Sequence, residues 1–228
     1  VGTDDGLLQV TEDGGESWQK IETFGSLDIP EFAYVSDIEP SKHDDDTVYV
    51  VVQNFKRGDF APYVVKSADR GKTWTDITGD LPERGSSYTL AEDHLKPELL
   101  FVGTEFGVYT TLSGGEKWTK FRDIQIQVDQ NDLVVGTFGR GIYILDDYSP
   151  LREISVESLK SDAEATIFPI PEALMYVQRR PLSGGGQAFQ GGGYYVAQNP
   201  PLGATITYRI KKSLKTKKQK RQSDEAKK

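Results

Sequence analysis

The sequence predicts an all-β fold built from repeated units of short strands. A turn motif occurs three times, at residues 11–18, 67–74 and 111–118, and these copies contain all three tryptophans of the chain. Short apolar runs precede and follow each copy. Glycine accounts for 23 of the 228 residues, which is typical of a chain rich in turns. A motif that returns about every 40–60 residues indicates a repeat architecture.

Each copy of the motif has the chemistry of a tight turn between two strands. In the first copy, the side-chain oxygens of Thr11 and Asp13 can accept hydrogen bonds from amides of the loop, and Gly15 supplies a positive φ angle. Trp18 then begins the next strand and presents a large apolar face to a neighbour. We therefore interpret the aspartate and the tryptophan as structural rather than catalytic.

The other two copies test this interpretation within the chain. The second copy keeps the carboxylate and the indole as Asp69 and Trp74. The third copy keeps the indole as Trp118 but has Ser113 in place of the aspartate. A unit that tolerates loss of the carboxylate relies on its glycines to make the turn.

The expected pattern is four short strands per unit, and all four can be assigned in the second unit. The expected strands, unit by unit, are 1–3, 7–10 and 18–21; 35–39, 48–52, 63–66 and 74–77; 99–104, 108–110 and 118–121; and 133–137 and 142–145. Short strands in units of this length are typical of β-propeller blades. We therefore expect residues 1–147 to be the closing blades of a propeller, each of four antiparallel strands, with an incomplete ring in this sequence.

The last unit ends differently from the others. After Leu145 the chain continues as Asp146-Asp147-Tyr148-Ser149-Pro150, without a motif copy or a tryptophan. A blade that stops at its third strand suggests that its fourth strand comes from elsewhere. We expect the rest of the propeller to lie before Val1.

Three further segments follow the repeats. Residues 148–164 read as a polar linker. Alternating strands near 165–169, 174–177, 194–197 and 204–210 predict a partial Ig-like β-sandwich over residues 165–212. Residues 213–228 are charged and of low complexity, and we expect them to form a disordered or surface tail.

Charge and composition exclude several classes of function. The net charge is −8, but residues 209–228 hold ten basic and two acidic side chains, so the preceding residues hold 17 basic and 33 acidic ones. Such an acidic body argues against nucleic acid as the main partner. The absence of cysteine excludes disulfides and thiolate metal sites. No apolar run of about 18 residues is present to span a membrane.

The motif S/T-x-D-x-G-x-S/T-W resembles the Asp-box, or bacterial neuraminidase (BNR) repeat, and two of the three copies match it fully. The ending Gly139–Asp147 resembles bacterial propellers of the sortilin (Vps10-domain) type, which are often labelled glycosyl hydrolases. The stretch Asn199–Tyr208 is similar to the sandwich that follows such propellers. The resemblance covers residues 1 to about 215. It implies a fold rather than an activity, because Asp-boxes recur in sialidases, xyloglucanases, sortilins and photosystem assembly factors.

In a propeller, the turns between second and third strands share one face with the crossings between blades. The motif copies lie at the opposite end, so we expect ligand contacts away from them. The candidate ligand-binding residues on these turns are Asp4, Asp5, Phe55, Arg57, Phe60, Glu105, Phe106, Phe138 and Arg140. Exposed aromatic rings beside charged groups can stack on sugars or hold a peptide. Arg140, which lies between two glycines, is the strongest single candidate.

Catalytic and metal sites are less well supported. A glycoside hydrolase requires two opposed carboxylates about 5–10 Å apart. One could come from Asp4, Asp5, Asp59 or Glu105, and no spacing in the sequence selects a pair. The run from His43 to Asp46 could hold a cation weakly, but a solvated turn is the preferred interpretation. We expect no metal and no cofactor.

These observations predict a non-catalytic binding or scaffolding module of an exported bacterial protein, in an extracellular, cell-surface or periplasmic location. Its ligand would be a protein, a peptide or a glycan. A polysaccharide hydrolase of the xyloglucanase type is the alternative function. A structural subunit of a cell-surface or secretion assembly is the second alternative.

Overall fold

The computed structural model describes residues 1–22, 24–121, 131–137, 141–155, 158, 163–173, 175, 177, 202–211 and 216–225. These residues form mostly strands, arranged in several antiparallel sheets, with few helices. The all-β class predicted from the sequence is therefore confirmed. The chain divides into two units, Val1–Lys160 and Ser161–Lys228.

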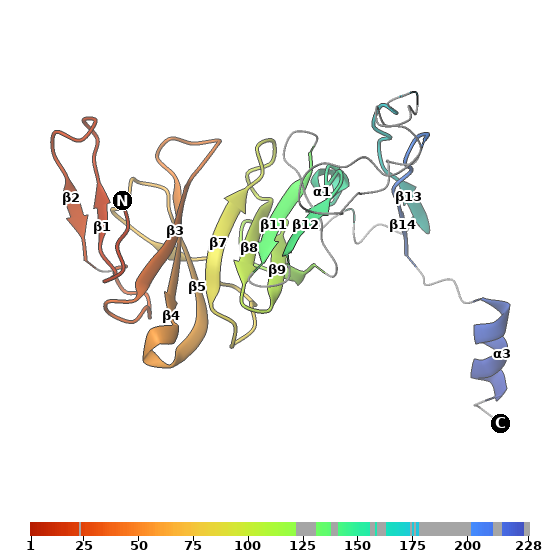
Figure 1. Cartoon of the computed structure of the whole chain (residues 1–228), viewed down its shortest axis with the longest axis horizontal. Coiled ribbons are helices and arrows are strands. Elements are labelled where there is room, and N and C mark those ends of the chain that lie inside the picture. The colour runs from red at the N-terminus through yellow and green to blue at the C-terminus, as the bar shows by residue number, and fades with distance from the viewer. Residues whose placement is uncertain are drawn as a thin grey trace, which may run out of the picture. The chain divides into compact units, whose positions relative to one another are not determined.

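Two four-stranded sheets make up most of the first unit (Figure 1). The strands of one are β3 (Tyr34–Pro40), β4 (Val48–Asn54), β5 (Asp59–Ser67) and β6 (Thr75–Asp76). The strands of the other are β7 (Ser87–Glu92), β8 (Leu100–Thr104), β9 (Gly107–Thr111) and β10 (Thr119–Lys120). In both sheets each strand pairs antiparallel with the next one in the sequence, so each sheet is a simple meander.

Two smaller sheets flank these in the sequence. The first contains β1 (Leu8–Val10) and β2 (Gln19–Ile21), and Gly2 forms an isolated bridge to Leu8. The other contains β11 (Leu133–Thr137) and β12 (Gly141–Leu145). The three copies of the turn motif, called the repeat turns below, connect β1 to β2, β5 to β6 and β9 to β10. Each therefore joins the last two strands of its sheet.

Short helices and one further pair of strands complete the described structure. The helices are η1 (Phe55–Arg57), α1 (Pro150–Glu153) and α3 (Lys217–Glu225), and β13 (Ala165–Ile167) pairs with β14 (Tyr208–Ile210). Of the expected strand 174–177, only Met175 and Val177 are described; neither is in a strand, and both are highly exposed. The expected strand 194–197 lies outside the described residues. No helix in the described part of the chain has the length and apolar character needed to cross a membrane.

The C-terminal tail contains a helix that was not expected from the sequence. The expected disordered or surface segment contains α3 over Lys217–Glu225. Lysine, glutamine, arginine and glutamate are good helix formers, and this stretch contains neither glycine nor proline. Its described side chains are exposed, so the helix lies at the surface of the second unit.

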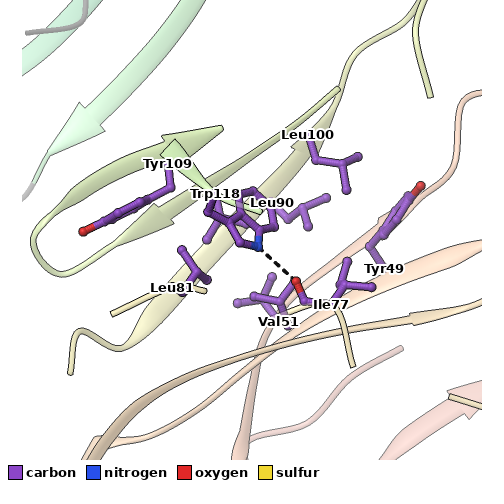
Figure 2. Packing of buried hydrophobic residues seen from close by; sticks show 10 residues of the cluster. Tyr49, Val51, Ile77, Leu81, Leu90, Leu100, Tyr109 and Trp118 are labelled. Atoms are coloured by element: carbon purple, nitrogen blue, oxygen red, sulfur yellow. Dashed lines mark hydrogen bonds between the residues drawn. The ribbon is translucent and has the colours of Figure 1, made fainter. Parts of the chain in front are cut away.

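The core of the first unit lies between successive sheets. Side chains alternate along β4, so its two faces serve two neighbours. Val50 and Val52 pack with Leu8 and Ile21 of the first sheet. Tyr49 and Val51 pack in the opposite cluster, with Leu90, Leu100 and Trp118 of the following sheet (Figure 2). This double burial explains the run of three valines at the centre of β4.

Each repeat turn after the first packs against the sheet that precedes it. Trp118 is buried, and its indole N–H donates to the carbonyl of Ile77 at 3.0 Å (Figure 2). The ring of Trp74 meets Phe24 edge-on, with centroids 5.2 Å apart. These indoles therefore join consecutive sheets, as the apolar face of the motif leads one to expect.

Candidate ligand-binding site at one end of the sheets

The connections opposite the repeat turns gather at one end of the sheets, called the loop end below. It consists of residues 3–6, 30–34, 55–60, 84–88 and 104–107. In Figure 1 the connection that carries η1 lies at the lower edge, and the β1–β2 turn lies at the upper edge. The loop end therefore contains both the turns between second and third strands and the crossings from one sheet to the next.

Hydrogen bonds link these loops in order. The amide of Val35 donates to Thr3 at 3.2 Å, and the guanidinium of Arg57 donates to the carbonyl of Glu31 at 2.6 Å. Further along, the amide of Gly85 donates to Phe60 at 2.8 Å, and the amide of Glu105 donates to Ser86 at 2.9 Å. Each loop is held by the next, which makes this end a continuous, ordered surface.

Aromatic rings and cations alternate across the loop end. Arg57 lies over the ring of Phe32, with 5.6 Å from its guanidinium carbon to the centroid. Lys56 lies 5.1 Å from the Tyr34 centroid, and Arg84 lies 5.0 Å from the Phe60 centroid. Such pairs are favourable by about 0.5–1 kcal/mol when exposed. Further exposed rings belong to Phe55, Tyr88 and Phe106.

Phe32 has an unusual backbone. Its φ is 58°, in the left-handed region, which costs a bulky side chain roughly 1–2 kcal/mol. Its ring is 61% exposed, so burial does not offset this cost. Strained residues of this kind cluster at functional sites. The loop end thus holds an aromatic side chain out toward solvent at an energetic cost to the free protein.

The structure brings together seven of the nine predicted ligand-binding residues. The residues at the loop end are Asp4, Asp5, Phe55, Arg57, Phe60, Glu105 and Phe106. All of these are exposed except Phe60, which is half-buried. The other two, Phe138 and Arg140, lie outside the described residues.

Arg84 also contributes to this end, but it was not predicted as a ligand-binding residue. Arg84 lies in the crossing from β6 to β7, and only the packing of two sheets brings it over Phe60. No local spacing in the sequence signals that contact. The basic and aromatic composition of the crossings was the available clue.

Two of the candidate hydrolase carboxylates, Asp59 and Asp5, accept hydrogen bonds from neighbouring groups. Asp59 accepts hydrogen bonds from the Tyr63 hydroxyl at 2.8 Å and from the amide of Ala61 at 3.0 Å. Burial alone would raise the pKa of Asp59, but these bonds and one from Asn54 lower it below its usual range. Asp5 accepts from the hydroxyl of Thr3. A general acid requires a raised carboxyl pKa, which Asp59 lacks.

The repeat turns at the opposite end use their aspartates within the loop. Asp13 accepts from the amide of Ser17 at 2.9 Å and from the hydroxyl of Thr11 at 2.8 Å. These bonds, with that of the Ser17 hydroxyl, lower the pKa of Asp13 well below its usual range. The carboxylate is therefore held ionised by its own turn.

The second repeat turn repeats this geometry, and the third replaces it. Asp69 accepts from the hydroxyl and the amide of Thr73 at 2.6 and 2.8 Å, which lowers the pKa of Asp69 to about 2. In the third turn, the hydroxyl of Ser113 accepts from the amide of Lys117 at 3.3 Å. The serine thus takes over one of the bonds that the carboxylates accept.

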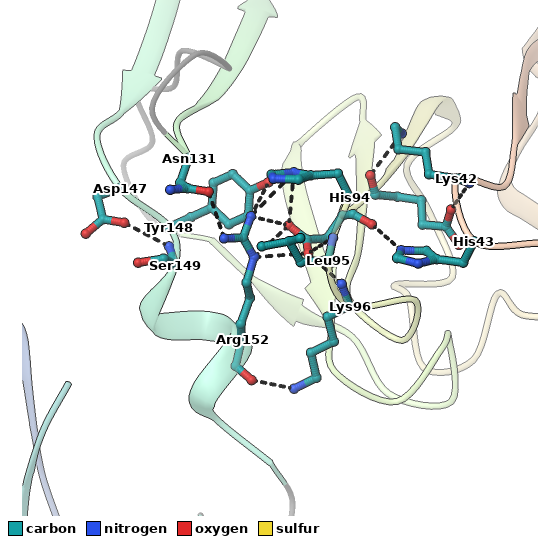
Figure 3. A network of polar contacts seen from close by, with 12 residues as sticks. Lys42, His43, His94, Leu95, Lys96, Asn131, Asp147, Tyr148, Ser149 and Arg152 are labelled. Carbon is teal, nitrogen blue, oxygen red and sulfur yellow. Dashed lines mark hydrogen bonds and ion pairs between the residues drawn. The ribbon is translucent and has the colours of Figure 1, made fainter. Parts of the chain in front are cut away.

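A second polar cluster joins the sheet β7–β10, the third sheet in chain order, to α1 (Figure 3). Asp93 is buried and accepts from the guanidinium of Arg152 at 2.8 Å and from the amides of Leu95 and Lys96 at 2.9 and 2.8 Å. The ammonium of Lys96 donates to the carbonyl of Arg152 at 2.9 Å. Residues at the start of the predicted polar linker, 148–164, are thus hydrogen-bonded to the segment that follows β7.

The two histidines lie beside this cluster, at the end that carries the repeat turns, and both contact Asp93. Nε2 of His43 lies 2.8 Å from the carbonyl oxygen of Asp93, and Nδ1 of His94 lies 3.9 Å from its carboxylate (Figure 3). In the turn that follows His43, Asp44 accepts from the hydroxyl of Thr47 at 2.7 Å. No group of three potential metal ligands occurs in the part of the chain that the structure describes.

Comparison with protein-family models and with curated proteins finds no match to this chain. The geometry of the loop end is therefore the basis for a proposed function.

Proposed function

We propose that this chain is part of a β-propeller of the Asp-box type that acts as a non-catalytic binding or scaffolding module. Its ligand is a protein, a peptide or a glycan, held at the loop end. The proposal includes the other expectations from the sequence, namely an exported bacterial protein, further blades before Val1 and a β-sandwich in the second unit.

Three features support a propeller. Each large sheet is a four-stranded meander, and successive sheets pack face to face through β4 and its neighbours. The first strands of consecutive sheets are also joined, because the carboxylate of Asp37 accepts from the hydroxyl of Thr89 and the amide of Leu90 at 2.6 and 2.9 Å. Repeated sheets joined along their first strands are the arrangement that a ring of blades requires.

The observation that carries the binding proposal is the strained, exposed Phe32 beneath the guanidinium of Arg57. Exposed aromatic residues that are fixed in place are characteristic anchors of binding interfaces. The other exposed rings of the loop end come from separate loops, so a ligand could contact several of them together. The lowered pKa of Asp59 gives no support to the hydrolase alternative.

The proposal is tested by screening the protein against a glycan array and a displayed random peptide library. The best binder is then measured against the variants Phe32→Gly and Phe106→Ser, and we expect at least a tenfold loss of affinity for each. Phe32→Gly should fold normally, because glycine relieves the left-handed strain. Loss of binding in this variant would therefore report a lost contact.

Leu95→Ser is the matched control for this experiment. Leu95 is 63% exposed, similar to Phe32, but it lies in the β7–β8 turn at the opposite end. Binding should survive this substitution. Equal losses in all three variants, or release of reducing ends from a bound glycan, would contradict a non-catalytic site at the loop end.

A further inference from the structure

The first repeat turn exposes a surface that the other two turns bury. Gly15, Gly71 and Gly115 occupy the same position in the three turns. The second and third of these glycines are buried, whereas Gly15 is exposed. The tryptophans show the same trend, since Trp18 is 48% exposed, Trp74 is half-buried and Trp118 is 7% exposed.

In both buried cases, an isoleucine of the preceding sheet covers the glycine. A Cβ atom added at Gly71 would lie 2.6 Å from Cδ1 of Ile21, and one added at Gly115 would lie 2.6 Å from Cβ of Ile77. Each isoleucine stands three residues after the tryptophan of its own sheet. The two contacts are therefore the same contact, repeated from one sheet to the next.

The first turn has the geometry that this glycine–isoleucine contact requires, although no isoleucine among the described residues covers Gly15. The amide of Gly15 donates to the hydroxyl of Thr11 at 2.8 Å, as the amide of Gly71 does to Ser67 at the same distance. The φ angle of Gly15 is 102°, close to the 107° of Gly115. A Cβ added at Gly15 would meet only the ring of Trp18, at 3.8 Å.

We propose that the surface formed by Gly15 and Trp18 docks a further antiparallel sheet of the same repeat, located before β1 in the same polypeptide. The fourth strand of that sheet would carry an aliphatic residue three positions after a tryptophan. The order of the chain supports this source, because the second and third repeat turns each pack on the sheet that precedes them in sequence. This inference rests on the propeller of the proposed function and gives its further blades before Val1 a defined docking surface. It is independent of the ligand proposed for the loop end, so either proposal can fail without the other.

A second copy of the chain fits this surface less well. In the third sheet, the residue three positions after the tryptophan is Phe121, and it packs in a cluster with Phe101, Tyr148 and Leu151. The segment after β12 thus covers the place where a fourth repeat turn would lie. A neighbouring copy would have to displace this segment before its third sheet could dock.

The test extends the chain with its own sequence. Residues 31–101 are added directly before Val1, so that Val1-Gly2-Thr3 takes the place that Val102-Gly103-Thr104 holds after β7. Hydrogen–deuterium exchange is then followed by mass spectrometry over residues 10–19. We expect exchange at least tenfold slower than in the original chain, because the added sheet would cover the first repeat turn.

The control is the same extended chain with Ile77→Asp in the added segment only, which should leave residues 10–19 as unprotected as in the original chain. A second variant, Gly15→Ala in the extended chain, should remove the protection by filling the site of the added isoleucine. The proposal is overturned if residues 10–19 exchange equally fast with and without the added segment. It is also overturned if the amides of the added strands exchange without protection. The same sequence is folded beside the first sheet in the original chain, so it should fold beside that sheet when added.

Discussion

Asp93 shows how a single buried carboxylate is kept ionised in this fold. Burial alone would raise its pKa, but hydrogen bonds from Arg152, Tyr148 and the amides of Leu95 and Lys96 outweigh it and lower the pKa to about 2. Burial and the nearby Asp93 raise the pKa of Tyr148 to about 12. The ionised Asp93 carboxylate and the charged Arg152 guanidinium therefore hold the α1 segment on the third sheet.

Removal of Arg152 should be strongly destabilising. Arg152→Met leaves the Asp93 carboxylate buried without its cation, and we expect a loss of about 3 kcal/mol in the free energy of unfolding at pH 7. Urea denaturation followed by circular dichroism measures this loss. Arg221→Met is the control, because Arg221 forms an exposed pair with Glu225 and its loss should cost less than about 0.5 kcal/mol. Equal effects of the two substitutions would contradict the role given to Asp93.

The same site predicts a pH dependence. The folded pKa of Asp93 lies below that of an unfolded aspartate, so its contribution to stability is complete above about pH 4 and is lost as the pH falls toward 2. In Arg152→Met the folded pKa rises, and this loss on acidification should shrink. Stability measured between pH 5 and 2.5 would show it, and an unchanged pH profile would argue against the pair.

At the scale of elements, the repeat turn is the unit that fixes one sheet against the next. Its hydroxyl and carboxylate bond the amides of the loop, and its glycine leaves room for the isoleucine of the preceding sheet. The two roles are separate, because the polar bonds shape the turn and the glycine permits docking.

Ser113→Asp should restore the stronger bond in the third turn. A carboxylate at this position can accept from the amide of Lys117 as Asp69 does from that of Thr73, and charge-assisted bonds are the stronger kind. We expect the Tm to rise by about 2 °C. The reciprocal change Asp69→Ser should lower it. Differential scanning calorimetry tests both changes, and a fall in Tm for Ser113→Asp would contradict this account of the turn.

Gly115→Ala and Gly15→Ala separate the second role from the first. Both substitutions place a side chain at positive φ, but only the methyl group at residue 115 meets Ile77. Overpacking of this kind costs about 1–3 kcal/mol, so Gly115→Ala should be destabilising by that much more than Gly15→Ala. Urea denaturation of the two variants measures the difference. Equal costs would show that backbone strain alone explains the glycines.

Most strands of the first unit and their order were predictable because they depend on local patterns, but β7 was not among the expected strands. The apolar run in β4 and the glycine-containing turns are visible in the sequence. The helical turn α1 was not predicted, since four residues are too few for a periodic signal and its stability comes from Arg152 and Tyr148 packing on another sheet. The loop-end turns were predicted because they depend on local sequence. The position of Arg84 over Phe60 was not predicted, because it depends on packing between sheets.

At the scale of the whole first unit, the two ends of the sheets have different chemistry. One end carries the repeat turns, whose side chains mostly bond to their own loops or to adjacent sheets. The other end carries exposed rings, cations on ring faces and the strained Phe32. We infer that stability is concentrated at the end with the repeat turns and ligand recognition at the loop end.

The affinity of the best glycan or peptide from the screen, measured for Asp69→Ser and Phe106→Ser well below their Tm, tests this division most directly. We expect Asp69→Ser to bind as tightly as the original protein despite its lower Tm, and Phe106→Ser to lose at least tenfold in affinity with its Tm unchanged. Lost affinity in Asp69→Ser together with full affinity in Phe106→Ser would place the ligand at the repeat turns and rule out recognition at the loop end.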